Sequence, residues 1–474
     1  MSLDLSFDLV IRHADVATAN DRFTCDIGIR DGRIEALALN LPAGRDEIDA
    51  TGLLTLPGGI DAHCHLDQPM PEGMSMADDF YTGTRSAACG GTTTVIPFAA
   101  QQKGQSLLAA VQDYHQRADG KAVVDYGFHL IVSDPSPQVL QQELPALIRA
   151  GHTSFKVYMT YDDLKLNDHQ MLDVLSVARG NGALVMIHAE NADCIAWLTE
   201  RLEQAGRTEP YYHAVSRPPL VEREAAHRAI SLAELVDTPI LLVHVSGPEA
   251  IEQIRWARQR GLDVHGETCP QYLYLTADDL RQDGYLGAKC VCSPPPRDAG
   301  SQQEVWRALA DGLFSVFSSD HAPFRYDDPR GKYLGGRAQP FRHIPNGIPG
   351  LETRLPLLFS GAVAGGRFDI HRFVALTATN PARLYGLYPR KGTIAVGADA
   401  DIALWDPKRR VVIRNENLHH DVDYTPYEGL EVTGWPVTTL VRGQVVCRDG
   451  QFLGQAGQGR FLPRHQPNTR MAAG

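Results

Sequence analysis

The chain of 474 residues is 43% hydrophobic and 22% charged, a balance typical of globular proteins, so a largely disordered polypeptide is excluded. Its 57 acidic residues outnumber its 45 basic residues, which gives a net charge of −12 with no basic block. Nucleic acid and anionic membrane surfaces are therefore not expected as partners. No apolar run reaches the ~18 residues of a membrane span, and the first residues lack the pattern of a signal peptide. The eight scattered cysteines are typical of reduced thiols, so we expect a cytoplasmic protein.

Both ends of the chain carry short strand patterns separated by turn signals. These patterns lie at residues 7–14, 26–30, 33–39, 401–405, 411–414 and 440–446. Because the two β-rich ends bracket a long middle of different character, we predict that residues 1–55 and 385–450 form one small β-sandwich domain. Residues 451–474 are rich in Gly and Gln, and we expect them to be a C-terminal extension on the surface.

The middle of the chain, residues 56–384, alternates apolar strand patterns with helical patterns. The eight strand candidates are 54–62, 92–98, 126–132, 155–159, 184–188, 240–245, 263–267 and 314–319. Helical periodicity falls between many of them, at 106–118, 138–150, 168–179, 222–235 and 249–260. Continuous apolar strands that alternate with helices indicate a parallel sheet covered on both faces. Eight such units predict an α/β fold of the (β/α)₈ barrel type.

Potential metal ligands stand at the ends of four of these strand candidates. They are His63 and His65, then His188, His244 and Asp320. The carboxyl ends of barrel strands meet at one face of a barrel, so side chains distant in sequence can converge there. Imidazole nitrogens and a carboxylate suit zinc or a similar divalent ion. Each residue alone has a plain structural interpretation, but their conjunction predicts a metal site.

Lys156 lies inside the strand candidate 155–159, which we expect to be buried on both faces. A buried ammonium group is costly, and a nearby dication would repel it, so the amine should be neutral or modified. A neutral lysine amine is a nucleophile that can react with carbon dioxide. The resulting carbamate carries two oxygens and can bridge two metal ions, and we predict this modification for Lys156.

Several motifs resemble the amidohydrolase superfamily, and nearly the whole chain is covered by the resemblance. They are GGIDAHCH at 58–65, FKV at 155–157, IHAEN at 187–191, VHVS at 243–246 and SDH at 319–321. Three further motifs are similar to one branch, the cyclic amidases called dihydropyrimidinases and D-hydantoinases. These are GETCPQYL at 266–273, CSPP at 292–295 and PNG at 345–347.

The resemblance implies a role for each matching residue. The implied ligands of two divalent ions, expected to be Zn²⁺, are His63, His65, Lys156 in its N6-carboxylated form, His188, His244 and Asp320. A bridging hydroxide would attack the ring carbonyl, with Asp320 as the proton carrier and Tyr161 as the donor to the oxyanion. Ser293 and Asn346 would bind the substrate. The implied activity is the reversible ring opening of 5,6-dihydropyrimidines or 5-substituted hydantoins to N-carbamoyl amino acids. Family members also suggest a cytoplasmic homotetramer.

The sequence departs from the branch at Gln68, where hydantoinases for bulky substituents tend to be apolar, and over residues 350–354. Met70, Met74 and Met76 predict either that this loop covers the ring's 5-position or that they fill the gap between the loop and the barrel. Asp67 and Glu72 predict a preference for uncharged rings.

Three alternatives share the fold, one of which is an enzyme for some other cyclic ureide or imide, because loop residues decide the substrate. An allantoinase- or dihydroorotase-like enzyme would have the same metal centre, but dihydroorotases carry an Arg at the position of Asp67 to hold the substrate carboxylate. Non-catalytic scaffolds such as the collapsin response mediators have lost metal ligands, whereas this chain keeps all six positions. The sequence leaves open whether dihydropyrimidines or hydantoins are the substrates.

Overall fold

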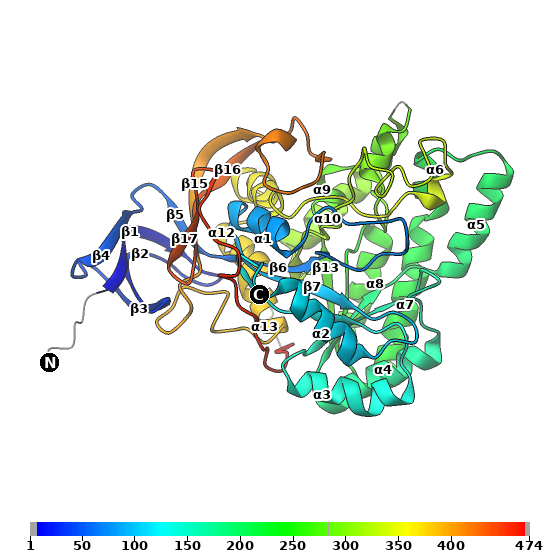
Figure 1. The fold of residues 1–474 in the computed structure, drawn as a ribbon, viewed down its shortest axis with the longest axis horizontal. Helices are drawn as coiled ribbons and strands as arrows, with labels where there is room; N and C mark the ends of the chain where they lie inside the picture. The colour runs from blue at the N-terminus through cyan, green and yellow to red at the C-terminus, as the bar shows by residue number, and fades with distance from the viewer. Residues whose placement is uncertain (1–6, 283, 470–474) are drawn as a thin grey trace.

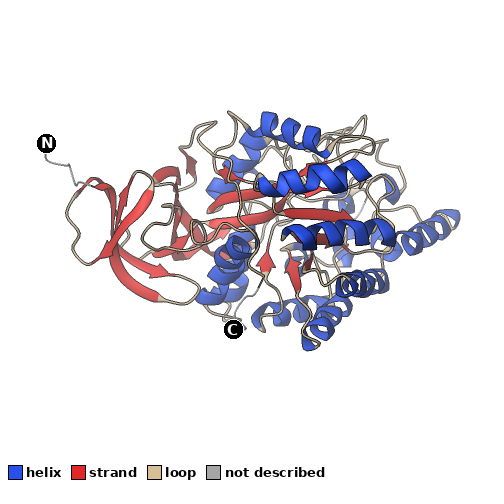
Figure 2. Ribbon diagram, turned by 90° about the horizontal axis from the view of Figure 1, so that it is seen from below, coloured by secondary structure: helices blue, strands red, loops and turns tan. Residues whose placement is uncertain are grey.

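The structure is a computed structural model that describes residues 7–282 and 284–469. A parallel barrel surrounded by helices lies beside a smaller sheet unit, which forms one end of the elongated molecule (Figures 1 and 2). In the described part of the chain, no helix is both long and apolar enough to cross a membrane.

The barrel consists of parallel strands in which each strand is hydrogen-bonded to the next. In spatial order they are β6 (Gly59–Cys64), β7 (Thr92–Ala100), β9 (His129–Ile131), β10 (Ser154–Tyr158), β11 (Leu184–His188), β12 (Ile240–Leu242), β13 (Val264–Thr268) and β14 (Val316–Phe317), with β8 (Asp125–Tyr126) beside β7. A bridge between Cys64 and His321 brings the last strand back to the first. The (β/α)₈ barrel prediction is confirmed.

The described residues form α-helices that lie around the barrel and between it and the terminal sheet (Figure 1). They are α1 (Phe80–Cys89), α2 (Leu107–Ala118), α3 (Leu144–Arg149), α4 (Asp168–Asn181), α5 (Ala192–Gln204), α6 (Tyr211–Ser216), α7 (Pro219–Leu235), α8 (Pro248–Gln259), α9 (Gln271–Tyr274), α10 (Ala299–Ala310), α11 (Arg354–Leu358), α12 (Ile370–Val374) and α13 (Asn380–Leu384). Helix α4 shows why these segments are helical: Asn167 and Gln170 form a capping box, and Gly182 ends the helix at φ +69°. The predicted helix 138–150 is interrupted, because a π-helical turn (Val139–Glu143) precedes α3.

The two ends of the chain form one sheet, as predicted. Its strands, in spatial order, are β18 (Gln451–Phe452), β17 (Gln444–Arg448), β16 (Glu431–Val441), β15 (Ile402–Val412), β5 (Leu54–Pro57), β1 (Phe7–Ala17), β2 (Arg22–Arg30) and β3 (Arg33–Ala38), with β4 (Gly44–Asp49) beside β1. The joint between the N-terminal and C-terminal halves is the antiparallel pairing of β5 with β15. Apolar residues from both halves of the sheet share one core cluster.

The strand predicted over 54–62 is two strands in different sheets, which corrects the prediction. β5 belongs to the terminal sheet and β6 begins the barrel, with Gly58 between them. Gly58 N donates a hydrogen bond to Asp401 O, and a Cβ atom at this position would lie 2.2 Å from Thr93 Oγ1. A larger residue at Gly58 therefore cannot make the step between the sheets without displacing Thr93.

The described part of the C-terminal segment, residues 451–469, is mostly exposed but is anchored to the rest of the molecule, and its role as a surface extension stays a prediction. β18 joins the terminal sheet, and the following residues run along the barrel. Phe461 forms a bridge to Tyr126, Leu462 is fully buried, and Arg464 donates to Ser154 Oγ at 2.8 Å and to Phe128 O. These contacts bury Leu462 and Arg464, which the Gly- and Gln-rich composition of the segment does not predict. The domain limits 1–55 plus 385–450, 56–384 and 451–474 stay a prediction, and β5 crosses the first of them.

Candidate metal centre and substrate cavity

All six predicted ligands lie in or directly after barrel strands. The alternation of side chains along a strand explains how two of them reach the interior. In β10, Phe155 and Val157 belong to the outer core that packs on the helices, so Lys156 between them points into the barrel. In β11, Leu184 and Met186 lie in the inner core cluster. His188 follows Met186 by two residues, so its side chain points to the same side of the strand.

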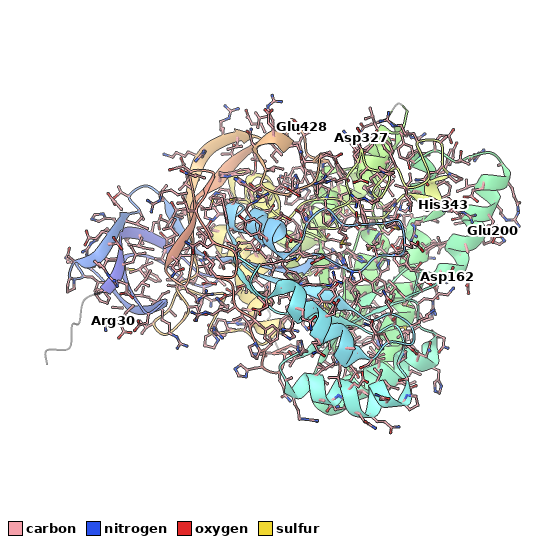
Figure 3. All side chains as sticks on the ribbon, in the orientation of Figure 1. Arg30, Asp162, Glu200, Asp327, His343 and Glu428 are labelled. Atoms are coloured by element: carbon pink, nitrogen blue, oxygen red, sulfur yellow. The ribbon has the colours of Figure 1, made fainter. Side chains whose placement is uncertain are left out.

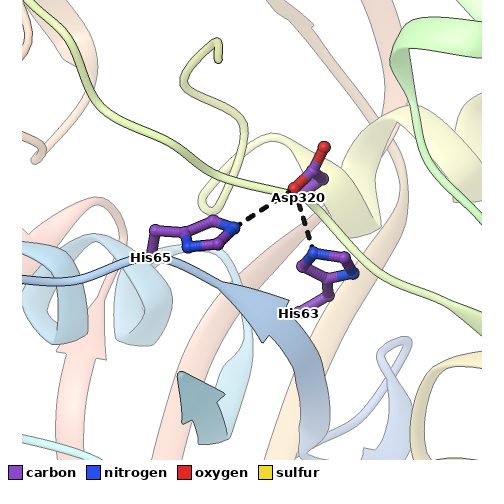
Figure 4. A group of neighbouring side chains, drawn as sticks. All are labelled: His63, His65 and Asp320. Atoms are coloured by element: carbon purple, nitrogen blue, oxygen red, sulfur yellow. Dashed lines mark ion pairs between the residues drawn. The ribbon is translucent and has the colours of Figure 1, made fainter. Parts of the chain in front are cut away.

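The first group of ligands brings His63, His65 and Asp320 together (Figure 4). Asp320 Oδ1 lies 3.1 Å from His63 Nε2 and 3.6 Å from His65 Nε2. One potential ligand atom from each residue lies within 4.8 Å of the others, and all three residues are buried. This group could hold a metal ion.

The second group lies beside the first. His188 Nδ1 is 3.0 Å from His244 Nε2, and the ring centroids of His244 and His63 are 5.4 Å apart. Lys156 Nζ lies 2.7 Å from His63 Nε2 and is therefore next to the first group. The structure thus brings all six predicted residues to one place, while their role as ligands stays a prediction.

The outer nitrogens of three histidines are held by acceptors. His63 Nδ1 lies 2.6 Å from Glu267 Oε1, His65 Nδ1 lies 2.6 Å from Gln68 Oε1, and His188 Nε2 lies 2.8 Å from Glu190 Oε2. Because each of these oxygens accepts a hydrogen bond, the outer nitrogen of each imidazole carries the proton. The inner nitrogen then has a free lone pair, which points toward the other ligands. Metal-binding histidines have this arrangement. The donor set therefore fits divalent metal ions.

These three acceptors were not among the predicted site residues. Glu267 ends the strand candidate 263–267, and Glu190 lies two residues after His188 in its motif. A carboxylate in an apolar strand was the available signal for Glu267. Its partner His63 is distant in sequence, and only the closed barrel shows the contact.

Burial favours the neutral form of three of the four histidines. It lowers the pKa of His65, His188 and His244, which favours the neutral form that binds metal. Burial raises the pKa of Asp320, but the neighbouring histidines, His63 above all, outweigh it and hold that pKa well below its usual range. Asp320 is therefore a carboxylate.

Three residues of the site adopt backbone conformations that are unusual for side chains other than glycine. Their φ angles are +38° at His244, +48° at Asp320 and +66° at Tyr161. Such conformations cost free energy and persist where the surrounding structure enforces them, which is frequent at functional sites. Here they follow the strand ends, and they turn the side chains toward the centre.

A cavity of about 950 Å³ lies directly above the ligands. Tyr161, Ser293 and Asn346 line it, and Asn346 Nδ2 donates a hydrogen bond to Tyr161 Oη at 3.2 Å. Asp162 and His343 line its outer part and lie at the end of the molecule away from Arg30 in the terminal sheet (Figure 3). The predicted substrate residues therefore share one cavity with the predicted ligands.

The loop after β6 forms one wall of this cavity, through Gln68, Met70, Met74 and Met76 among others. Asp67 does not line it. Its carboxylate is paired with Arg117 at 3.0 Å and with Lys121 at 3.7 Å. The prediction that Asp67 repels an anionic ring is therefore wrong, because its backbone at φ +49° directs the side chain to other partners.

The departing segment 350–354 does not line the cavity either. Glu352 accepts a hydrogen bond from His419, and Arg354 donates to Phe317 O and Thr92 Oγ1. These differences therefore do not touch the substituent of a bound ring.

Comparisons with known proteins agree with this site. The model of the amidohydrolase family matches residues 54–446. The chain is 46% identical to a D-hydantoinase of Geobacillus stearothermophilus, with 98% of each chain covered, and 44% identical to a D-hydantoinase of Ralstonia pickettii, with 97% of this chain and 99% of the relative covered. The solved dihydropyrimidinase of Brevibacillus agri has a TM-score of 0.94 at 44% identity, with 97% of this chain and 99% of that chain covered. The chain belongs to the amidohydrolase family, in the group of the D-hydantoinases and dihydropyrimidinases.

Proposed function

We propose that the protein is a metal-dependent cyclic amidase, a hydrolase that opens the ring of 5,6-dihydropyrimidines or 5-substituted hydantoins to N-carbamoyl amino acids. The observation that carries this function is the convergence of six ligand-type side chains under a cavity that also contains Tyr161, Ser293 and Asn346. Relatives that share almost the full length are named D-hydantoinase and dihydropyrimidinase, which supports this substrate class.

Two divalent ions, which we infer to be zinc, would be held by His63, His65 and Asp320 on one side and by His188 and His244 on the other. Lys156, carboxylated at its side-chain nitrogen, would be the shared ligand. When bound, such ions polarise the carbonyl under attack and lower the pKa of water. The modification needs a neutral amine, and burial lowers the pKa of Lys156 to about 8.

The chain's own residues then handle the proton and the ring. Asp320 is ionised and accepts the proton of the attacking water, and the same carboxyl group delivers it to the leaving ring nitrogen. Tyr161 donates its hydroxyl hydrogen to the oxygen that becomes negative in the tetrahedral intermediate. Asn346 already donates to Tyr161 Oη and so holds it in place. Ser293 and Asn346 bind the imide edge of the ring.

The part of the cavity along the loop after β6 receives the ring substituent. Met70, Met74 and Met76 line it together with Phe324. Thioether side chains are flexible and apolar, so they can pack around substituents of different shape. We also infer a cytoplasmic enzyme that assembles as a homotetramer, as the family resemblance implies.

A turnover panel with metal analysis tests the function. Purified protein is assayed with dihydrouracil, dihydrothymine, hydantoin, D- and L-5-substituted hydantoins, allantoin and dihydroorotate. We expect hydrolysis of dihydropyrimidines or 5-substituted hydantoins and close to two metal ions per chain. Turnover of allantoin or dihydroorotate alone would contradict the proposal. A protein without stoichiometric metal and without turnover would identify a scaffold.

A further inference from the structure

Gln68 contacts the predicted metal ligand His65 and also lines the substrate cavity. Its Oε1 lies 2.6 Å from His65 Nδ1, and its side chain lines the cavity. It stands on the same loop as Met70, Met74 and Met76, which form the apolar wall. Gln68 is therefore a polar group within an otherwise apolar wall.

The contact with His65 determines the orientation of the Gln68 amide. His65 presents Nε2 to Asp320, at 3.6 Å, so Nε2 is the nitrogen with the free lone pair. Its proton is then on Nδ1, which donates a hydrogen bond, and the partner atom must be an acceptor. The amide oxygen of Gln68 is consequently bound to His65, and the amide nitrogen points away from it.

The amide nitrogen of Gln68 is left as a donor without a partner. Among the residues that the structure describes, none accepts a hydrogen bond from Gln68 Nε2, and this atom is not one of the fully buried polar atoms. Because the side chain lines the cavity, its two N–H groups are available to a molecule bound there. The imidazole of His65 holds the amide in this orientation, so the donor is preorganised.

We propose that Gln68 selects cyclic ureides whose ring substituent carries a hydrogen-bond acceptor, such as a carbonyl oxygen, close to the ring. This inference rests on the proposed function and adds the chemical class of the substituent. An apolar substituent of the same shape would fill the methionine-lined wall equally well, but it would leave the N–H groups of Gln68 without a partner. A desolvated donor without a partner weakens binding, so the acceptor is preferred.

Two substrates of nearly equal shape test the proposal. They are 5-carbamoylmethyl-hydantoin, which has a carbonyl acceptor, and 5-isobutyl-hydantoin, which has none. The quantity to measure is the ratio of kcat/KM for the two substrates in the wild type and in Gln68→Met, which keeps the length of the side chain and removes the amide. We expect the ratio to favour the carbamoylmethyl substrate and to fall about three- to tenfold in Gln68→Met, the value of one neutral hydrogen bond.

The ratio of the two kcat/KM values distinguishes a change in substrate preference from a change in metal content. Gln68→Met also removes the acceptor of His65, so metal content is measured, and a loss of metal lowers both rates without changing their ratio. The matched control is Gln102→Met, which changes a glutamine at the exposed rim of the same cavity and should leave the ratio unchanged. An unchanged ratio in Gln68→Met, or an equal fall in both variants, would overturn the proposal.

The failure of the proposed function would be recognisable in the same experiment. If the metal-loaded wild type opens neither ring, nor those of the turnover panel, the function is wrong. Dissociation constants for the two hydantoins, which calorimetry can then measure without interference from turnover, decide the inference about Gln68. The carbamoylmethyl compound should bind more tightly than the isobutyl compound, and Gln68→Met should remove the difference. Equal constants in the wild type would refute the selection.

Discussion

Lys156 differs from an ordinary lysine at a barrel mouth in burial and in position. Its residue is 1% exposed, and Nζ lies 2.7 Å from His63 Nε2 and 4.4 Å from the centroid of the Phe98 ring. No described carboxylate forms an ion pair with it in the structure. A permanent ammonium at this place would oppose metal binding, whereas a carbamate would support it.

We expect Lys156→Ala to lose metal and activity together. The alanine removes the shared ligand, and a short-chain carboxylic acid in the buffer should restore part of both because it supplies two oxygens in the vacated space. Metal analysis and turnover are measured on the same samples. An alanine variant with full metal content and full turnover would show that Lys156 is only structural.

Tyr161 lies 5.4 Å from the ring centroid of His188 and contacts Asn346 through its hydroxyl group. Tyr161→Phe removes one donor to the oxyanion and leaves the ring in place, so kcat should fall by ~10²–10³ with unchanged metal content. Steady-state kinetics and metal analysis check this expectation. If the variant instead loses metal, Tyr161 supports the ligands and does not stabilise the oxyanion.

The sequence predicted the site at the level of residues but not of side-chain directions. Five of the six ligand-type residues could be found because barrel strands place their carboxyl ends at one face, and Lys156 because a lysine inside a buried strand is unusual. The direction of the Asp67 side chain could not be predicted, because it depends on a positive φ and on Arg117 from helix α2. For the same reason, the sequence shows Gln68 only as a departure from the hydantoinase pattern. Its hydrogen bond to His65 is visible only in three dimensions.

At the level of elements, β13 links the two groups of ligands through Glu267. Glu267 Oε1 accepts from His63 Nδ1 at 2.6 Å and from the backbone N–H of His244 at 3.2 Å, and the carboxylate is fully buried. One carboxylate oxygen from a third strand therefore fixes a ligand of each group. The spacing of the groups depends on it.

We expect Glu267→Gln to weaken metal binding by about 10- to 100-fold, the range for losing the partner of a ligating histidine. The substitution keeps the shape but replaces the anion that holds the proton of His63. Competition with a chelator gives the affinity without any assay of turnover. Glu249→Gln, a change on helix α8 at the outside of the barrel, is the control and should have no effect. Equal affinity of both variants and the wild type would exclude this role of Glu267.

The element boundaries show where sequence patterns stop being informative. A strand buried on both faces is an apolar run without alternation, so the pattern over 54–62 identified extended chain but not the sheet to which each part belongs. The change of sheet at Gly58 depends on Thr93 and Asp401, which come from other parts of the chain. The burial of Leu462 and Arg464 depends equally on partners distant in sequence.

At the level of the whole molecule, a buried ion cluster joins the terminal sheet to the barrel. Lys391 Nζ lies 2.6 Å from Asp125 Oδ2, 2.6 Å from Asp401 Oδ2 and 3.1 Å from Asp399 Oδ2. Asp125 is in β8 of the barrel, whereas Asp401 precedes β15 of the terminal sheet. Arg442 contacts Asp125 as well. A single lysine thus contacts carboxylates from both units, and Arg390 and Arg442 supply further positive charge at Asp399 and Asp125.

Lys391→Met should lower the free energy of unfolding by about 3–5 kcal/mol, because it leaves buried carboxylates without their cation. Urea denaturation measures the change, and exposed Lys408→Met on β15 is the control, with an expected change within about 0.5 kcal/mol. A change in Lys391→Met as small as in the control would mean that Arg390 and Arg442 balance the cluster without the lysine.

The pairing of β5 with β15 has a consequence for the synthesis of the chain. The ribosome produces β1 and β5 first, and β15, which pairs with β5, follows only after the whole barrel has been made. Until then β5 has an open edge, and unpaired strand edges on incomplete chains promote aggregation. Chains that stop before β15 should therefore aggregate, although they contain every residue of the proposed metal centre.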